Sequence, residues 1–101
     1  MNKERWRQLS LCEQMGNIGS EVGRTLKFEK IESDESKRTL GRAIELFDLT
    51  LDDPRWKNRL KEIARAKEVF LDTVLGDNIY GTKEGLEDYF NHFGLCAMNR
   101  A

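Results

Sequence analysis

The sequence predicts an all-α fold, an antiparallel four-helix up-down bundle that forms a single domain over residues 1–101. One proline in the whole chain leaves long segments free to be helical. In four segments apolar residues recur every three or four positions, which is the spacing of one helix face, and no segment alternates in the manner of a β-strand. The expected helices cover approximately residues 10–28, 34–52, 54–75 and 82–98. A three-helix core with the fourth helix crossing it is the alternative arrangement.

The first helix is expected to begin after Ser10. Ser10 and Glu13 have the spacing of a capping box, in which the hydroxyl and the carboxylate each satisfy a free backbone N–H of the first turn. The polar run at residues 27–35 predicts a loop after this helix. Its expected apolar face consists of Leu11, Met15, Ile18, Val22 and Leu26.

The second helix is expected to be apolar on two sides. Its main apolar face consists of Leu40, Ile44, Phe47 and Leu51. Leu46 and Leu49 project from the opposite side, so these two leucines need cover from elsewhere in the protein or from a partner.

The third helix has the clearest start in the chain, since Asp53 is a typical N-cap residue and Pro54 suits the first helical position. Gly76 is a typical residue to end it. The fourth helix follows the turn-rich segment GDNIYGT at residues 76–82, with Thr82 as its N-cap. The expected apolar faces are Trp56, Leu60, Ile63, Phe70, Leu71 and Val74 in the third helix, and Leu86, Tyr89, Phe90, Phe93, Cys96 and Ala97 in the fourth.

The composition is that of a soluble globular protein, with 39% hydrophobic and 35% charged residues. A net charge of −1 gives no general attraction to nucleic acid or to a membrane surface. No apolar run approaches the length of a membrane span, and the N-terminus lacks the pattern of a secretory signal. We therefore expect a cytoplasmic protein with no membrane partner, in which Cys12 and Cys96 are reduced core residues.

Three glycines, Gly16, Gly19 and Gly23, align on one side of the first expected helix. Each glycine costs about 1 kcal/mol relative to alanine inside a helix, so some compensating contact is expected. Close approach of another backbone is the simplest one. The neighbour can be another helix of the same bundle, a second copy of the chain, or a ligand or peptide in a groove.

A dense basic run at residues 54–67 surrounds Trp56. Basic residues combined with an aromatic residue on one helix can bind a phosphate backbone, so this run predicts a nucleic-acid contact; the alternative is a solvated face that pairs with acidic residues elsewhere. The candidate contact residues are Arg55, Lys57, Arg59, Lys61 and Arg65.

Lys67 falls within the apolar face of the third helix, between Ile63 and Phe70. A lysine there must extend its amine to solvent or pair with a carboxylate. Asp48 is the candidate partner in a buried ion pair, and Glu21 is an alternative.

The sequence assigns no catalytic residue, no metal site and no cofactor. Its one histidine and two distant cysteines do not form a zinc-binding pattern, and no phosphate-binding loop or nucleophile motif is present. The pairs Glu29-x-x-Glu32 and Glu45-x-x-Asp48 resemble the metal-binding motifs of MazG-type nucleotide pyrophosphohydrolases. That resemblance implies a Mg²⁺-dependent enzyme as a remote alternative.

Three segments, LSLCEQMGNIGSEVGR, RAIELFDLTLDDPRW and GDNIYGT, resemble those of a group of short bacterial all-helical proteins. The resemblance spans nearly the whole chain and implies a compact helical domain, without transferring any catalytic residue.

The sequence as a whole predicts a non-enzymatic interaction or accessory module with a protein partner, either itself or another protein. Its interaction residues would be the three glycines with Leu46 and Leu49. A nucleic-acid-binding accessory protein is the alternative.

Overall fold

The computed structural model describes residues 2–76 and 83–99, with side chains described as far as residue 93. The described residues form helices and connecting segments without a β-strand, which confirms the all-α class. The elements are α1 (Lys3–Trp6), α2 (Leu11–Leu26), α3 (Asp34–Leu51), the 3₁₀ helix η1 (Pro54–Arg59), α4 (Leu60–Leu75) and α5 (Lys83–Asn99).

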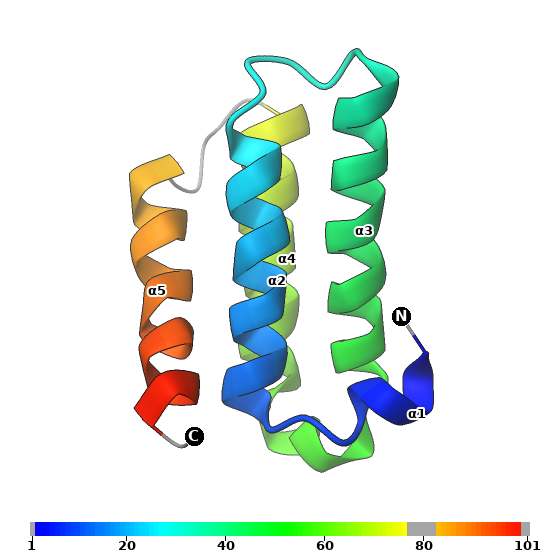
Figure 1. Ribbon diagram of the computed structural model, residues 1–101, viewed down its shortest axis with the longest axis vertical. Coiled ribbons are helices and arrows are strands. Elements are labelled where there is room, and N and C mark those ends of the chain that lie inside the picture. Colours follow the sequence, from blue (N-terminus) through cyan, green and yellow to red (C-terminus); the bar gives the residue numbers. More distant parts are fainter. Residues whose placement is uncertain (1, 77–82, 100–101) are drawn as a thin grey trace.

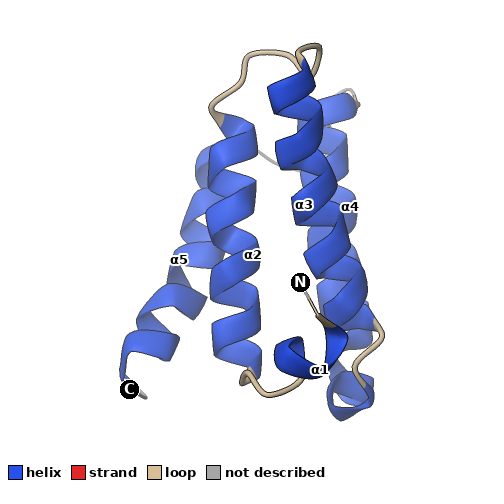
Figure 2. Ribbon diagram, turned by 45° about the vertical axis from the view of Figure 1, so that its right-hand side comes forward, coloured by secondary structure: helices blue, strands red, loops and turns tan. Residues whose placement is uncertain are grey.

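The four long helices lie side by side, and each runs in the opposite direction to the one before it (Figure 1). α2 lies between α3 and α5, and α5 packs chiefly against α2 and only lightly against α4. The short α1 lies at the end of the molecule where α3 ends and α2 begins (Figure 2). Because α2 contacts both α3 and α5, it is the helix around which the candidate surfaces are built.

Aromatic rings occupy the centre of the core. The ring centroid of Phe47 on α3 lies 5.9 Å from that of Phe70 on α4 and 6.1 Å from that of Phe90 on α5. Side chains from α2 complete this centre, since Met15, Ile18 and Val22 are at most 1% exposed. Burial of these faces is the main driving force for the association of the helices.

The buried face of α3 differs from the expected one. Leu40 and Phe47 are buried as predicted, whereas Ile44 and Leu51 are half-buried. The other buried positions of α3 are Ser36, Thr39, Ala43 and Thr50. Thr50 can be buried because its hydroxyl donates to the carbonyl of Leu46 and accepts a hydrogen bond from Trp6 Nε1 at 2.9 Å. The face is therefore rotated toward small and polar residues.

In the third expected helix, α-helical geometry begins later in the sequence than predicted. Asp53 is the N-cap and Pro54 the first residue, but they open the 3₁₀ helix η1, and the α-helix begins at Leu60. Trp56 interrupts helical geometry with φ −100° and ψ 23°. This offset leaves Leu60 37% exposed, so Leu60 does not belong to the core.

A buried polar network joins the N-terminal segment to the start of η1. The amide of Gln14 donates to the carbonyl of Trp6 at 2.8 Å and to Asp53 Oδ2 at 3.3 Å, and its oxygen accepts from Trp56 Nε1 at 2.8 Å. Gln14 and Trp6 are fully buried, and Asp53 is 1% exposed. Since every one of these buried groups has a partner, the network holds α1 against the bundle.

Cys12 is disulfide-bonded, which corrects the expectation of a reduced core thiol. Cys12 lies in the first turn of α2, and the backbone of Cys96 lies near the end of α5; these two helix ends are at the same end of the molecule (Figure 1). The cysteines therefore no longer support a reducing compartment. The cytoplasmic location stays a prediction.

Candidate interaction surface

The glycines of α2 differ in what they contact. A Cβ atom built on Gly19 would lie 2.7 Å from the Cβ of Phe90, so at this position the backbone of α2 is in close contact with α5. A Cβ atom on Gly23 would meet no atom of the described part of the chain within 4 Å. Packing inside the bundle therefore explains the glycine at position 19 and does not explain the glycine at position 23.

Gly19→Ala is expected to lower the free energy of unfolding by about 1–2 kcal/mol. The Cβ of Phe90 is fixed to its backbone, so α5 would have to shift, and overpacking of this kind exceeds the helix-propensity gain of about 1 kcal/mol. Gly41→Ala is the matched control, because Gly41 is also a helical glycine and a Cβ built on it meets no described atom within 4 Å. Urea denaturation of both variants measures the difference, and equal stabilities would contradict the close contact at Gly19.

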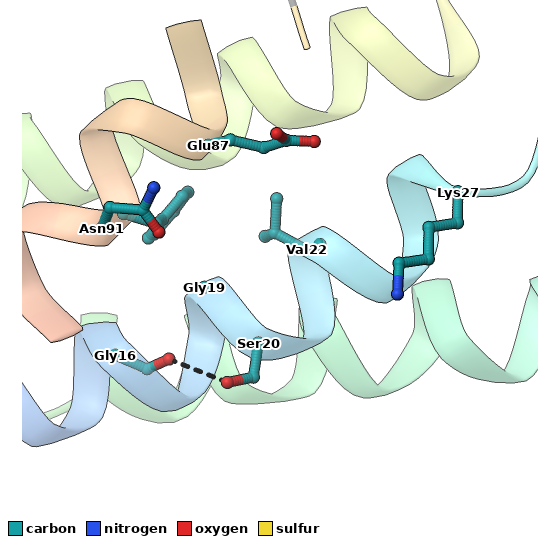
Figure 3. Close-up of a pocket in the computed structure, with 9 residues that line it drawn as sticks. Gly16, Gly19, Ser20, Val22, Lys27, Glu87 and Asn91 are labelled. Carbon is teal, nitrogen blue, oxygen red and sulfur yellow. Dashed lines mark hydrogen bonds between the residues drawn. The ribbon is translucent and has the colours of Figure 1, made fainter. Parts of the chain in front are cut away.

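A groove of about 380 Å³ runs between α2 and α5 beside these glycines (Figure 3). Its α2 wall is made of small side chains, and the hydroxyl of Ser20 is turned back onto the carbonyl of Gly16 at 3.3 Å. Charged and polar side chains border it, with Lys27 from α2 and Glu87 and Asn91 from α5. The groove therefore combines a wall of small α2 side chains, where another backbone can approach closely, with a polar border.

Leu46 and Leu49, expected on the far side of the second helix, are both half-buried and pack against the edge of the core. Leu46 lines a cleft between α2 and α3. Leu49 lines a shallow hollow on the outer side of α3, next to Gly41. The two leucines thus border different depressions, and neither borders the groove beside the glycines.

The basic run is largely paired with acidic side chains. Arg55 Nη2 lies 2.7 Å from Asp53 Oδ2, Arg59 Nε lies 2.8 Å from Glu62 Oε2, and Arg65 Nη1 lies 3.9 Å from Glu68 Oε2. Lys57 and Lys61 are exposed and have no ion pair within the described part of the chain. Most of the positive charge that would attract a phosphate backbone is therefore locally compensated.

Arg59 and Glu62 also meet α5 through Tyr89. The Tyr89 hydroxyl donates to Glu62 Oε1 at 3.1 Å. Burial, followed by the charge of Glu62, raises the pKa of Tyr89 to about 12. The hydrogen bond from Arg59 keeps the pKa of Glu62 below its ordinary value. This triad links η1 and α4 to α5.

Lys67 and Asp48 form an ion pair, with Nζ and Oδ1 2.7 Å apart. Their side chains are 26% and 57% exposed, so the pair lies at the protein surface. It joins α4 to α3 across the outside of the bundle. An exposed pair of this kind contributes at most about 1 kcal/mol to stability.

The two acidic pairs that resemble a metal-binding pattern occupy separate elements. Glu29 and Glu32 lie in the loop between α2 and α3, whereas Glu45 and Asp48 lie on the exposed side of α3. Among the side chains described at residues 2–76 and 83–93, no three from His, Cys, Asp or Glu are placed to hold a metal ion. The segment GDNIYGT lies outside the described residues except for Gly76, as does the expected N-cap Thr82.

Comparison of the chain with models of protein families, with curated proteins and with solved structures finds no match. The resemblance to short bacterial helical proteins therefore stays a prediction. None of the helices in the described ranges is both long enough and apolar enough to cross a membrane.

Proposed function

We propose that the chain is a non-enzymatic protein–protein interaction module that docks a helix on the exposed side of α2, and that the docked helix belongs to a second copy. The supporting observation is Gly23, because no described neighbour requires a glycine there. A glycine inside a helix costs about 1 kcal/mol relative to alanine. A partner backbone lying against Gly23 would offset that cost, as α5 does at Gly19.

The charges along α2 favour a second copy in an antiparallel orientation. Gly16, Ser20 and Gly23 follow one another at intervals of four and three residues, and so lie on one side of the helix. Glu13 lies near the start of this side and Lys27 just after its end. A two-fold axis at Ser20 would place each Glu13 opposite the partner's lysine at position 27, and such a self-complementary surface is typical of a two-fold interface.

Gly23→Leu is expected to convert a dimer of twice 11.8 kDa into a monomer without loss of thermal stability. The new side chain has room within its own chain but would hold the partner helix away. Gly41→Leu is the matched control, because Gly41 is also a helical glycine with no atom within 4 Å of a built Cβ, on the outer side of α3. Size-exclusion chromatography with light scattering gives the masses, and circular dichroism gives the melting temperatures.

A monomeric parent protein at high concentration would overturn the second copy as partner. Loss of the dimer in Gly41→Leu but not in Gly23→Leu would move the interface to α3, where Leu49 lies.

Absorbance at 260 nm, recorded on the same column, tests the nucleic-acid alternative. A raised signal that salt removes would indicate that Lys57 and Lys61 contact nucleic acid.

A further inference from the structure

A second depression lies between α2 and α3, on the side of α2 next to that of the groove. It has a volume of about 380 Å³, and Ser20 is the one residue that it shares with the groove of Figure 3. Its walls are charged and polar, in contrast to the small side chains of the groove. The lining residues are Trp6, Asn17, Ser20, Glu21, Arg24, Arg42, Glu45 and Leu46.

A mostly buried carboxylate lies in this cleft between two arginines. The side chain of Glu21 is 13% exposed. Its Oε1 accepts a hydrogen bond from Arg24 Nη1 at 2.7 Å, and its Oε2 lies 3.9 Å from Arg42 Nε. Oε2 is buried and has no hydrogen-bond donor among the described residues. Glu21 therefore holds one arginine from α2 tightly and one from α3 loosely.

The two guanidinium groups remain accessible at the mouth of the cleft. The side chains of Arg24 and Arg42 are 63% and 60% exposed. A guanidinium has five N–H donors, and the hydrogen bond to Glu21 uses one donor of Arg24. Glu21 and Glu45 balance the charge of the two arginines in the cleft, but several guanidinium N–H donors have no partner among the described residues and can bind an oxyanion between the two helices.

We propose that this cleft binds the phosphate group of a small phosphate monoester. A phosphate group has enough oxygens to accept hydrogen bonds from two guanidinium groups at once. The cleft lies within the volume range of small-molecule sites, so it has space for an organic group beyond the phosphate. Leu46 offers that group a half-buried apolar wall.

Polar side chains next to the arginines suit a hydroxylated ligand. The Asn17 amide donates to the carbonyl of Glu13 at 2.8 Å, and the Ser20 hydroxyl donates to that of Gly16. The side-chain oxygen of Asn17 is thereby left as an acceptor for the ligand, whereas Ser20 lies on the axis of the proposed dimer. Glu45 adds a negative charge at the edge of the cleft and opposes the phosphate, so it should limit the affinity.

Isothermal titration of the intact chain with phenyl phosphate and with inorganic phosphate tests the site. Arg42→Gln should weaken binding of phenyl phosphate roughly tenfold, because it removes a charge-assisted contact. Glu45→Gln should strengthen it about two- to fivefold, because it removes the opposing charge. Arg38→Gln is the control: it makes the same charge change one turn earlier on α3, outside the cleft, and should change affinity less than about twofold.

The site would be supported by saturable binding that Arg42→Gln weakens, Glu45→Gln strengthens and Arg38→Gln leaves nearly unchanged. Tighter binding of phenyl phosphate than of inorganic phosphate would support a monoester as the ligand. Equal weakening by Arg42→Gln and Arg38→Gln would overturn it, as would no binding of either compound. Binding of a short oligonucleotide through Arg42 but of neither small compound would also overturn it. Gly23→Leu should bind phenyl phosphate as the parent does, so loss of dimerisation and loss of phosphate binding are separately observable.

Discussion

Replacing Phe47 with alanine should lower the free energy of unfolding by about 3–5 kcal/mol, the largest effect of any single substitution considered for this chain. Phe47 is fully buried, and its ring lies within about 6 Å of the rings of Phe70 and Phe90. The substitution removes the side chain at which α3, α4 and α5 meet, and the surrounding helices can collapse only partly into the cavity. Urea denaturation followed by circular dichroism measures the change.

Two controls separate this effect from a general loss of apolar surface. Phe47→Leu keeps most of the volume and should cost less than about 1.5 kcal/mol. Phe28→Ala removes the same atoms from a half-buried position in the loop after α2, and should cost under about 1 kcal/mol. If Phe47→Ala and Phe28→Ala had similar costs, Phe47 would not be the centre of the core.

The long helices could be predicted because their sequences carry both a start signal and a regular apolar face. Ser10 and Glu13 form the capping box that their spacing predicts, with N–H to oxygen distances of 3.0 and 3.1 Å. The face that follows is buried from Met15 to Leu26. Local hydrogen bonds and a period of 3.6 residues are properties of the sequence itself, so they require no knowledge of the neighbouring helices.

The start of α4 could not be placed because its signal is ambiguous. Asp53 and Pro54 predict the beginning of a helix equally well whether the first turns are α or 3₁₀. The choice depends on Trp56, whose indole N–H reaches Gln14, 42 positions away in the sequence. Similarly, α1 is too short to show a period, and Trp6 is buried through its contacts with Thr50 and Gln14.

The candidate surfaces were partly predictable. Alignment of the glycines on one side of a helix correctly indicates a close approach, and Gly19 makes one with α5. The same alignment cannot show that Gly19 has a close neighbour and Gly23 does not, because that difference depends on where Phe90 of α5 lies. The cleft between α2 and α3 left no signal in the sequence, since Glu21 and Arg42 are brought together by the pairing of two helices.

Replacing Asp53 with alanine should lower the free energy of unfolding by on the order of 3 kcal/mol. Asp53 Oδ1 caps η1 by accepting from the backbone N–H of Arg55 at 3.0 Å. Its Oδ2 accepts from Arg55 Nη2 at 2.7 Å and from the Gln14 amide. Alanine removes the cap and the charge-assisted bonds together and leaves the buried amide of Gln14 with one partner fewer. Asp53→Asn keeps a capping oxygen, so it should lose less stability than alanine.

Acid titration isolates the contribution of the charge on Asp53. Its hydrogen bonds with Arg55 lower its pKa from 3.8 to about 2, so the folded state favours the carboxylate. The stability from this group is therefore fully present above about pH 4 and is lost as the pH falls toward 2. Asp53→Asn should lack this part of the pH dependence, measured by urea denaturation between pH 2 and pH 6. Parallel pH profiles for the two proteins would show that the buried network does not depend on that charge, and its hydrogen-bond geometry alone would then hold α1 to the bundle.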